Sequence, residues 1–579
     1  MVPRLIDALR AAGVERGARL ALAVQPDVGL GLGLAHGETI VCSATDPGAL
    51  VGVIEVELQP RWVMWSQATA AVLVAAGVRV ATCWDIAAVH RLLFGGWRAD
   101  PARVWALLNA LPLDALPTEA PLDLFNLDPL ADGDPEEPVR ADGYLRPDWA
   151  SGAWATSPPR LARWAALGAV AADRQHAALV ALADSPHALL TARAESTIEL
   201  LCAELSADGL PMRRDVAEAV IADIIGPRPR DERDTDEQRR RRDADVIRHV
   251  PNADDLDLRS PGQVKSLLRR AGIEVPDTRA WRLRSLRDTH PVVDALLAWR
   301  KAERVATTYG YAWLDEHLGA DDRLRGVWSG ADGAAGRMTA SAGLHNMPAD
   351  MRVAVVAEPG HVFVRADLGQ IEPRVLAAVS NDAALAAATL DDDMYAPVAR
   401  QLAVERAIAK VAVLGAMYGQ TTGHGAQALG RLESSYPVAM AYLRSADRAG
   451  QGSRLLRTNG GRLIDVGSTN ANDVSEHDGR RIAAARGRYG RNAMVQGAAA
   501  ELFKMWALTV RRRAVPFDAC IVLCLHDELL VHAPEVHGDT VARLVVDAVD
   551  EAAQRWAPGG TVRFVADVSV VARWSDAKG

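Results

Sequence analysis

The chain has 579 residues, of which 49% are hydrophobic and 24% are charged, and its formal net charge at pH 7 is −9. This composition is typical of a folded globular protein and excludes a disordered or collagen-like chain. The length is too great for a single hydrophobic core, so we expect about three or four domains. The acidic total argues against a uniformly basic surface for polyanions, but local clusters of charge decide what a surface binds.

The N-terminus and the cysteines narrow the class of protein further. Residues 1–22 carry charges throughout and lack the apolar core of a secretory signal. No apolar run approaches the roughly 18 to 20 residues that a membrane helix needs. The cysteines, at positions 42, 83, 202, 520 and 524, are too scattered for a disulfide framework or a zinc quartet. We therefore expect a cytoplasmic protein that does not enter the membrane.

Hydrophobic patterns change along the chain and outline its parts. Residues 1 to about 110 mix short apolar runs with helical periodicity, which predicts a small α/β domain. Residues 112–160 are rich in Pro, Asp and Gly and are predicted to form an extended connector. Residues 160–320 read as mostly helical, and the mixed-charge run "GPRPRDERDTDEQRRRRDAD" within them predicts a solvated helix face or loop. From residue 351 onward, strands and helices alternate.

The stretch "VFVRADLGQIEPRVLAAVS", residues 362–380, places an acid at the end of an apolar strand. We expect the strand to end at Asp367 and a helix to begin near Ile371. A carboxylate there, beside freed backbone carbonyls, is well placed to hold a hard divalent cation. The simpler alternative is that the aspartate caps the helix.

In "ERAIAKVAVLGAMYGQ", residues 405–420, four side chains are spaced by four. Arg406, Lys410, Leu414 and Tyr418 would form one stripe on an α-helix, with two cations for phosphates and an apolar and an aromatic contact for a nucleotide. The chain has only five lysines among its 65 basic residues, so Lys410 suggests a need for an ammonium that can give up its proton. The alternative is a solvated face with a buried tyrosine.

The stretch "CIVLCLHDELLVHA", residues 520–533, predicts a β-hairpin with His526, Asp527 and Glu528 at its tip. Acids in such an apolar run need a cation or a turn to solvent. If this hairpin neighbours the strand of Asp367, Asp367 and Asp527 can clamp a pair of metal ions. Paired metals on shared carboxylates are a recurrent device for phosphoryl and nucleotidyl transfer.

These three stretches, in this order, resemble motifs A, B and C of family A DNA polymerases, the DNA polymerase I family. "GRMTASAGLHNMP" (336–348) and "RYGRNAMVQGAAAELFKMW" (488–506) are similar to two further segments of that family, and "LRSPGQVKSLL" and "LLAWRKAERVATTYG" to its thumb and the junction with its palm. The likeness covers about residues 190–579.

The resemblance implies a multidomain α/β and α+β fold: a right-hand polymerase with an antiparallel palm sheet and helical fingers and thumb, preceded by a small α/β exonuclease-like domain. The implied parts are residues 1–175 (exonuclease-like domain and connector), 176–320 (thumb and junction), 321–390 (palm), 391–490 (fingers) and 491–579 (palm).

The resemblance also implies a role for each matching residue. Asp367, Asp527 and the carbonyl of Leu368 would hold two Mg²⁺, with Mn²⁺ as a possible substitute, and Lys410 would protonate the leaving pyrophosphate. The implied catalytic residues are Asp367, Asp527, Lys410 and Glu528. The implied substrate-binding residues are Arg406, Lys410, Leu414, Tyr418, Glu372, Gln370 and His526. Within these sets Tyr418 would close the base-pair pocket, Glu372 would exclude a 2′-hydroxyl, and His526 and Glu528 would support the primer end. The implied DNA-binding residues are Arg337, Asn346, Arg488, Asn492 and Gln496.

Two local features qualify the resemblance. Leu414 stands where the family has Phe or Tyr, and Leu368-Gly369 replace its Tyr-Ser, so we expect altered acceptance of dideoxynucleotides. Between residues 444 and 491, ten arginines stand against five acids near "RTNGGRL". This local excess is expected to face a phosphate backbone, with a scattered solvated surface as the alternative.

The N-terminal part lacks the acids of a proofreading exonuclease. "WDIAAVHRLLFGG" (84–96) resembles a segment of such domains, but no Asp-x-Glu strand precedes it. Tyr144 and Asp148 have the spacing of the Tyr-x-x-x-Asp motif, but the Pro between them makes a shared helix unlikely in the connector. We expect a degenerate domain without 3′–5′ exonuclease activity.

The implied function is that of a DNA-directed DNA polymerase in DNA repair or replication, acting as a monomer on primer-template DNA and dNTPs. Two alternatives remain open at this point: a single-subunit RNA polymerase with the same motif order, against which Glu372 and Glu528 argue, and a non-catalytic DNA-binding relative.

Overall fold

The computed structural model describes residues 2–34, 38–44, 46–118, 133–253, 255–333, 335–419, 426–467 and 476–577. The chain divides into two compact units. Unit 1 comprises Met1–Asp208, Val327–Thr339 and Gly360–Val570, and unit 2 comprises Gly209–Gly326, Ala340–Pro359 and Val571–Gly579. Among the described residues, no helix is both long and apolar enough to cross a membrane.

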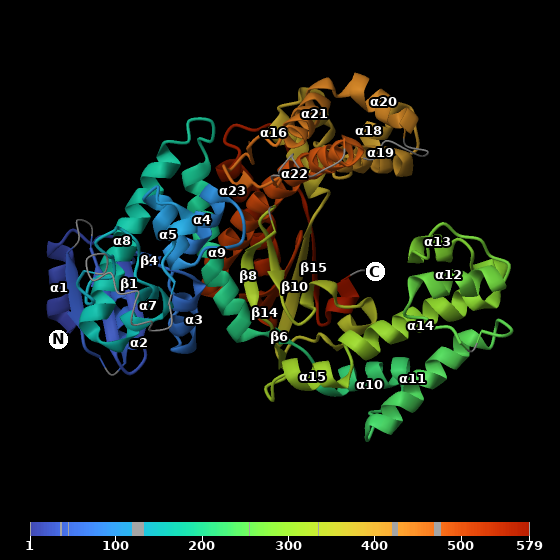
Figure 1. The fold of residues 1–579 in the computed structure, drawn as a ribbon, viewed down its shortest axis with the longest axis horizontal. Helices are drawn as coiled ribbons and strands as arrows, with labels where there is room; N and C mark the ends of the chain where they lie inside the picture. The colour runs from blue at the N-terminus through green and yellow to red at the C-terminus, as the bar shows by residue number, and fades with distance from the viewer. Residues whose placement is uncertain are drawn as a thin grey trace. The chain divides into compact units, whose positions relative to one another are not determined.

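The N-terminal part of unit 1 is the expected small α/β domain, built on a five-stranded sheet in the order β3-β2-β1-β4-β5 (Figure 1). β1 pairs antiparallel with β2 and parallel with β4. Gly31 and Gly33 of β2 let helix α8 approach closely, because a Cβ on Gly31 would lie 2.2 Å from the backbone nitrogen of Ala162. The strands are β1 Arg19–Gln25, β2 Gly29–Gly33, β3 Thr39–Cys42, β4 Arg61–Met64 and β5 Cys83–Asp85. The helices are α1 Val2–Ala11, α2 Pro47–Leu58, α3 Gln67–Ala75, α4 Ile86–Phe94, α5 Pro101–Leu108, η2 Leu113–Ala115, α7 Pro147–Ser151, η3 Ala153–Thr156, α8 Pro158–Val180 and α9 Ala188–Asp208.

The prediction of an extended connector over residues 112–160 was wrong for residues 133–157. This segment contains α7 and η3 and packs on α8: Trp149 is fully buried, and the ring of Trp154 stacks on that of Trp164 with centroids 5.9 Å apart. Burial of large aromatic rings here outweighs a composition that favours extended chain. Pro147 is compatible with a helix because it stands in the first turn. The rest of the predicted connector, residues 119–132, lies outside the described residues.

A four-stranded sheet in the order β13-β14-β10-β15 forms the second sheet of unit 1 (Figure 1), and its β13–β14 and β14–β10 pairs are antiparallel. β10 ends at Leu368, one residue later than expected, and α16 begins at Ile371 as expected. α22, 39 residues long, packs against α23, and Trp506 and Trp556 of these two helices are fully buried. The strands and short helices of this region are β8 Trp328–Asp332, β9 Arg337–Ala340, β10 His361–Leu368, β11 Leu456–Arg457, β12 Leu463–Ile464, η8 Val515–Phe517, β13 Cys520–Leu525, β14 Glu528–Pro534, η9 Glu535–His537 and β15 Ala566–Val571.

A helical subdomain is inserted between β10 and β13. Its core includes Tyr395, Met417 and Leu443, which are buried against one another. α22 runs without a break through the predicted boundary between residues 490 and 491. The helices are α16 Ile371–Ser380, α17 Ala383–Ala388, α18 Tyr395–Leu402, α19 Arg406–Tyr418, α20 Ala426–Ser435, α21 Pro437–Gln451, α22 Glu476–Ala514 and, after the hairpin, α23 Gly538–Trp556.

Buried ion pairs fasten the N-terminal part of unit 1 to the rest of that unit. Glu195 of α9 accepts two hydrogen bonds of 2.7 Å from Lys504 of α22 and pairs with Arg462. All three side chains are at most 4% exposed. Arg457 adds a further link to the N-terminal part, because it donates a hydrogen bond of 2.9 Å to the carbonyl of Leu93 in α4.

Those contacts correct one prediction in part. Arg457 and Arg462 belong to the ten arginines of residues 444–491 that were expected to face a phosphate backbone, but the guanidinium groups of these two bond within the protein. Carbonyl and carboxylate groups of distant segments bind these two guanidinium groups. A count of charges along the sequence does not show such partners.

Unit 2 is mostly helical, as expected for residues 209–320. Its core lies between α12 and α14 and includes Leu267, Leu268 and Leu296. The mixed-charge run forms helix α11, in which only Val246 is buried, so it is the predicted solvated helix. The elements are β6 Leu210–Pro211, α10 Arg214–Ile225, α11 Glu232–Ile247, α12 Pro261–Arg270, α13 Ala280–Arg284, η4 Arg287–Thr289, α14 Pro291–Thr308, α15 Tyr311–His317, β7 Arg323–Leu324, η5 Leu344–Asn346, η6 Ala349–Ala354 and η10 Trp574–Ala577.

Candidate active site

The predicted hairpin is present, and its turn separates the two acids. β13 and β14 pair antiparallel up to Leu525 opposite Glu528, which leaves His526 and Asp527 as the two turn residues. His526 has φ 34°, a left-handed conformation that a non-glycine residue adopts at a cost. Asp527 is half-buried in the turn, whereas Glu528 is buried as the first residue of β14. The neighbouring acids therefore have different environments.

The two acids predicted as metal ligands lie on adjacent chain segments. β10 pairs antiparallel with β14 so that Asp367 stands opposite Glu528. The backbone N–H of Leu368 donates a hydrogen bond of 2.8 Å to the carbonyl of Asp527. The sheet thus brings together residues 160 positions apart, as the sequence predicted.

These residues offer the hard oxygen donors that Mg²⁺ or Mn²⁺ prefers. Within the described part of the chain, the carboxylate oxygens of Asp367, Asp527 and Glu528 do not all lie within 4.8 Å of one another. The donor chemistry fits a divalent cation.

Sequence reasoning missed a buried arginine beside these acids. Arg365 lies two residues before Asp367 on β10, and its side chain is 3% exposed. It donates a hydrogen bond of 2.7 Å to Asp367 Oδ2, and bonds of 3.3 Å to Glu528 Oε2 and to Asp567 Oδ2 of β15. Burial opposes the charge, but the hydrogen bond and charge of Glu528 and the charges of the other two acids raise the pKa of Arg365. The signal in the sequence was a lone arginine inside the apolar run "VFVRADL".

The stripe on residues 406–418 is helical, as predicted, and its cations are exposed on α19. Arg406 forms an ion pair with Asp393, which also accepts a hydrogen bond of 2.8 Å from Nε2 of Gln370. The bond from Arg406 lowers the pKa of Asp393. Two predicted substrate ligands, Gln370 and Arg406, therefore share one carboxylate. Leu414 is half-buried against the core of the helical subdomain.

Glu372 connects two further predicted residues. Its carboxylate accepts a hydrogen bond of 2.8 Å from Arg337 and one of 2.9 Å from the hydroxyl of Tyr418. Burial, the charge of Glu372 and this hydrogen bond raise the pKa of Tyr418, while a hydrogen bond with Gln496 acts the other way. Partial desolvation and then the charge of Arg337 lower the pKa of His526. Glu372 of α16 thus links Tyr418 of α19 to Arg337 of β9.

Three of the predicted DNA ligands lie on one face of α22, because Arg488, Asn492 and Gln496 are spaced by four. The side chain of Arg488 packs close to Gly419, since a Cβ there would lie 2.9 Å from Arg488 Cγ. Oδ1 of Asn492 is buried and has no hydrogen-bond partner among the described residues. Asn346 lies in unit 2, at the end of η5, where its backbone carbonyl accepts a hydrogen bond from Arg304.

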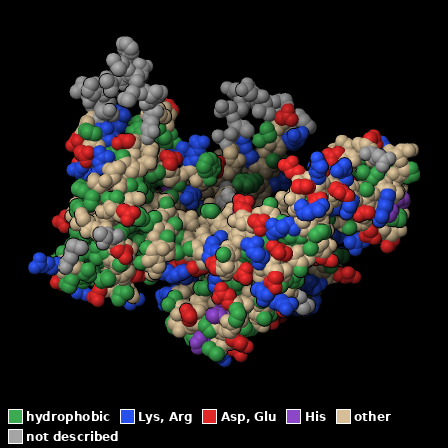
Figure 2. Space-filling view, turned by 90° about the horizontal axis from the view of Figure 1, so that it is seen from below, with side chains coloured by type: hydrophobic (Ala, Val, Ile, Leu, Met, Phe, Trp, Pro, Cys, Tyr) green, Lys and Arg blue, Asp and Glu red, His purple; other side chains and the backbone are tan. Residues whose placement is uncertain are grey.

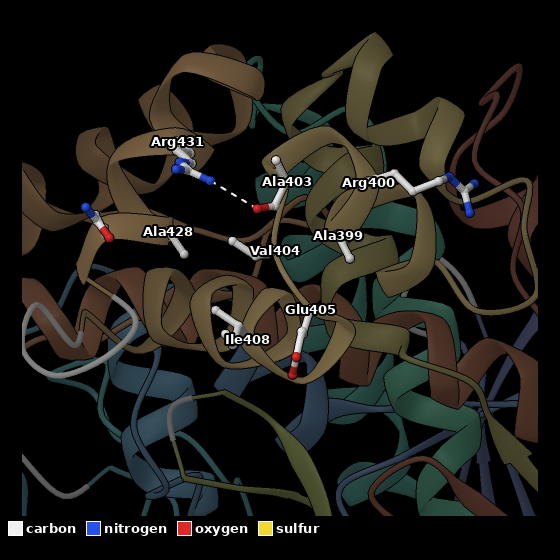
Figure 3. Close-up of a pocket in the computed structure, with 9 residues that line it drawn as sticks. Ala399, Arg400, Ala403, Val404, Glu405, Ile408, Ala428 and Arg431 are labelled. Carbon is white, nitrogen blue, oxygen red and sulfur yellow. Dashed lines mark hydrogen bonds between the residues drawn. The ribbon is translucent and has the colours of Figure 1, made fainter.

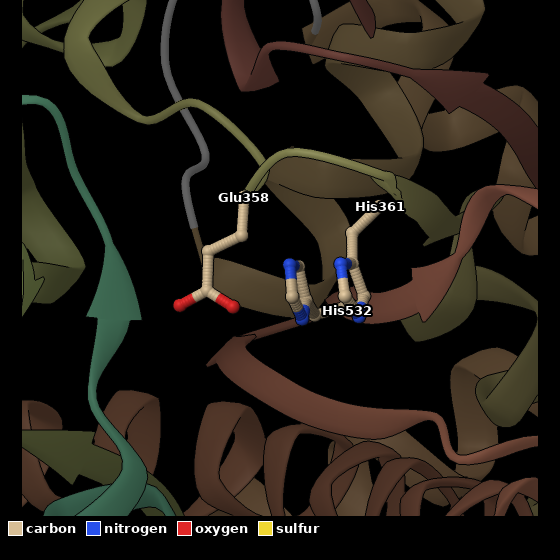
Figure 4. A group of neighbouring side chains, drawn as sticks. All are labelled: Glu358, His361 and His532. Carbon is tan, nitrogen blue, oxygen red and sulfur yellow. The ribbon is translucent and has the colours of Figure 1, made fainter.

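Two other features of unit 1 lie away from these residues. A pocket of about 710 Å³ between α18, α19 and α20 is lined by Glu405, Ile408 and Arg431, among others, and by none of the predicted site residues (Figure 3). His361 and His532, on β10 and β14, stack with ring centroids 4.5 Å apart (Figure 4). Both histidines lie near the N-terminal end of β10, whereas Asp367 lies near its C-terminal end.

Positive and negative side chains are interspersed over the face seen in Figure 2. This mixture agrees with the net charge of −9. On this face, a polyanion would meet individual cations and not a uniformly basic surface.

Comparisons with known proteins agree with this arrangement. The family model described as DNA polymerase family A matches residues 232–576. DNA polymerase I of Chloroflexus aurantiacus is 31% identical over 297 residues, which cover 46% of this chain and 31% of the relative. The thermostable DNA polymerase I of Thermus thermophilus is 28% identical over 330 residues, covering 52% and 38%. The chain thus matches only about a third of the length of these curated relatives.

A solved structure shares the fold over the whole chain. It is the POL domain of Pol1 from M. smegmatis in complex with DNA primer-template and dNTP. The TM-score is 0.69 at 19% sequence identity, and the match covers 100% of this chain and 99% of the other. The predicted mixed fold, with its antiparallel palm sheet and surrounding helices, is confirmed.

Proposed function

This chain belongs to DNA polymerase family A, and we propose that it is a DNA-directed DNA polymerase that adds dNTPs to a primer 3′-hydroxyl. The observation that carries the proposal is the register of β10 and β14, which places Asp367 opposite Glu528 and beside the His526-Asp527 turn. The proposed reaction is nucleotidyl transfer at two metal ions, in DNA repair or replication.

Asp367, Asp527 and the carbonyl of Leu368 would hold the two Mg²⁺ ions, with Mn²⁺ as a substitute. Bound there, the ions would activate the primer hydroxyl and stabilise charge on the leaving pyrophosphate. Lys410 is exposed on α19, and its ammonium would contact the triphosphate and supply a proton to pyrophosphate. Arg406 would bind the triphosphate after exchanging Asp393 for phosphate oxygens. In that exchange, Gln370 would keep its hydrogen bond to Asp393.

We assign primer-template contacts to Arg337, Arg488, Asn492, Gln496 and, in unit 2, Asn346. The side-chain donors of Arg488, Asn492 and Gln496, spaced by four on α22, support contacts to hydrogen-bond acceptors of the DNA. Donor contacts to minor-groove acceptors check the shape of a base pair without reading its identity. His526 and Glu528 would support the primer end.

The proposed division of the chain follows the family: an exonuclease-like domain and connector over 1–175, thumb and junction over 176–320, palm over 321–390 and 491–579, and fingers over 391–490. We propose that the protein acts as a cytoplasmic monomer.

We further propose that the N-terminal domain has no 3′–5′ exonuclease activity. β1, the position of the Asp-x-Glu pair, reads "RLALAVQ", and its Ala21 and Ala23 are buried in a core shared with Trp65 and Trp164. Tyr144 lies before α7 and Asp148 within it, and the Tyr144 hydroxyl donates to the carbonyl of Pro112. A 3′-labelled single strand should stay intact when it is incubated with the purified protein and Mg²⁺. Degradation of the strand by the purified protein would contradict this proposal.

The direct test of the function is extension of a 5′-labelled primer on a template with Mg²⁺. We expect extension with dNTPs and none with ribonucleotides or without a template. Extension with ribonucleotides alone would indicate an RNA polymerase, and no extension under any condition would indicate a non-catalytic relative.

Replacing Leu414 by Tyr is expected to change the ratio of dideoxy- to deoxynucleotide incorporation by about tenfold, because a ring and a hydroxyl would be added beside the sugar. The measurement is competitive primer extension with mixed dNTP and ddNTP. Ile408→Tyr, on another face of α19, is the matched control and should leave the ratio unchanged. An unchanged ratio in Leu414→Tyr would remove this residue from the sugar site.

Replacing Glu372 by Ala is expected to raise ribonucleotide incorporation by about tenfold or more, because the carboxylate would no longer occupy the space of a 2′-hydroxyl. The same change frees the Tyr418 hydroxyl and Arg337. Single-nucleotide incorporation of rNTP against dNTP measures the effect. Glu405→Ala, at the exposed start of α19, should keep the parent ratio.

A further inference from the structure

The buried Arg365 guanidinium lies among the acids of the proposed metal site. Arg365 and Asp367 are two residues apart on β10, so their side chains leave the same face of the sheet. Asp367 Oδ2 is 2.7 Å from Arg365, and Glu528 and Asp567 are each 3.3 Å away. Residues of three neighbouring strands thus share one fixed positive charge.

This charge has two opposing effects on a divalent ion. Carboxylates held close together without a cation repel one another, and the guanidinium removes that repulsion. The same guanidinium repels an incoming divalent cation and occupies one carboxylate oxygen of Asp367. Because the Arg365 side chain is 3% exposed, water screens neither effect well.

We propose that Arg365 is a positioning residue that holds Asp367 and Glu528 in place without metal and competes with the divalent ion for Asp367. Arg365 therefore sets the divalent-ion concentration at which the site fills. This role rests on the proposed metal site at Asp367 and Asp527.

The test measures Mn²⁺ binding to the whole protein by electron paramagnetic resonance, without DNA or nucleotide. Binding to the proposed metal site is the part of the total Mn²⁺ binding that is lost in Asp527→Asn. Arg365→Met is expected to bind this Mn²⁺ at least about tenfold more tightly than the parent, because the competing charge is gone. Arg365→Lys keeps the charge and should stay within about threefold of the parent affinity.

Thermal unfolding separates positioning from a general structural role. Arg365→Met should melt below the parent in EDTA, and the deficit should shrink in saturating Mn²⁺, because the ion then neutralises the acids. Arg400→Met is the matched control, since it removes an arginine that is 71% exposed and pairs with Asp391. This control should keep both the Mn²⁺ affinity and the melting temperature of the parent.

Three outcomes would overturn the inference. The first is an unchanged Mn²⁺ affinity in Arg365→Met, and the second is an equal loss of melting temperature in EDTA and in Mn²⁺. If Arg365→Met does not fold, Asp567→Asn replaces it as the test, at a side chain that is 83% exposed. This change leaves more of the guanidinium charge to Asp367 and should weaken Mn²⁺ binding by about threefold. An unchanged Mn²⁺ affinity in Asp567→Asn is the third outcome. If Asp527→Asn removes no Mn²⁺ binding from the parent, the proposed metal site itself is wrong, which is a distinct result.

Discussion

Replacing Asp527 by Asn is expected to reduce primer extension by at least about 10³-fold, equivalent to about 4 kcal/mol of transition-state stabilisation. The substitution keeps the size of the side chain and removes its charge. Asp527 occupies the two-residue turn beside the end of β10, where Leu368 donates to its carbonyl. That backbone bond and the turn persist with Asn, so the hairpin should fold. What is lost is a charged oxygen ligand for the divalent ion.

The effect is measured as the single-turnover rate at saturating dNTP, with the Mg²⁺ concentration varied. The matched control is Asp518→Asn, which stands just before β13 on the same hairpin. Asp518 is exposed and has φ 50°, a conformation that Asn also accepts. It should retain the parent rate within about twofold. An Asp527→Asn variant that keeps a tenth of the parent rate would argue against a metal ligand at this position.

Replacing Glu195 by Gln is expected to lower the free energy of unfolding by about 3 to 5 kcal/mol. Glu195 is 2% exposed and receives the ammonium of Lys504 and the guanidinium of Arg462, themselves 1% and 4% exposed. A neutral amide leaves two buried cations without their counter-charge. Since α9 and α22 meet at this carboxylate, the attachment of the N-terminal part of unit 1 should weaken along with stability. Urea denaturation followed by tryptophan fluorescence measures the change.

The pH dependence of this effect has a definite sign. Burial acts to raise the pKa of Glu195, but the charges of Arg462 and Lys504 and their hydrogen bonds exceed it, so its pKa lies below the ordinary value of 4.5. A lowered pKa in the folded state means that the carboxylate stabilises the protein above pH 4.5 and loses this contribution as pH falls through the folded-state pKa. The difference between the parent and Glu195→Gln should therefore shrink in acid.

An exposed ion pair supplies the control for Glu195. Glu237 of α11 pairs with Arg241 one helical turn later, and their side chains are 56% and 73% exposed. Glu237→Gln should change the free energy of unfolding by less than about 0.5 kcal/mol. If both substitutions cost the same, the Glu195 cluster does not act as a buried network.

Much of the fold and the candidate site follows from local patterns. The strand and helix around Asp367, the helix carrying Arg406 to Tyr418 and the hairpin around Asp527 were all predictable from the sequence. Each depends on apolar runs, turn residues and helical spacing within about twenty residues. Motif order along the chain was enough to place these segments in one family, because the chemistry restricts which residue types can stand there.

The tertiary structure alone decided which charged groups meet. Arg457 and Arg462 look like phosphate ligands by composition, yet carbonyls and Glu195 hold them inside the protein. Arg365 is visible in the sequence as a lone arginine in an apolar run, but its partners Glu528 and Asp567 come from β14 and β15. Local patterns identify the helices, the strands and the acids proposed to carry the chemistry. Tertiary packing selects the partner of each buried charge, because these partners come from segments as much as 431 residues apart that share no local pattern.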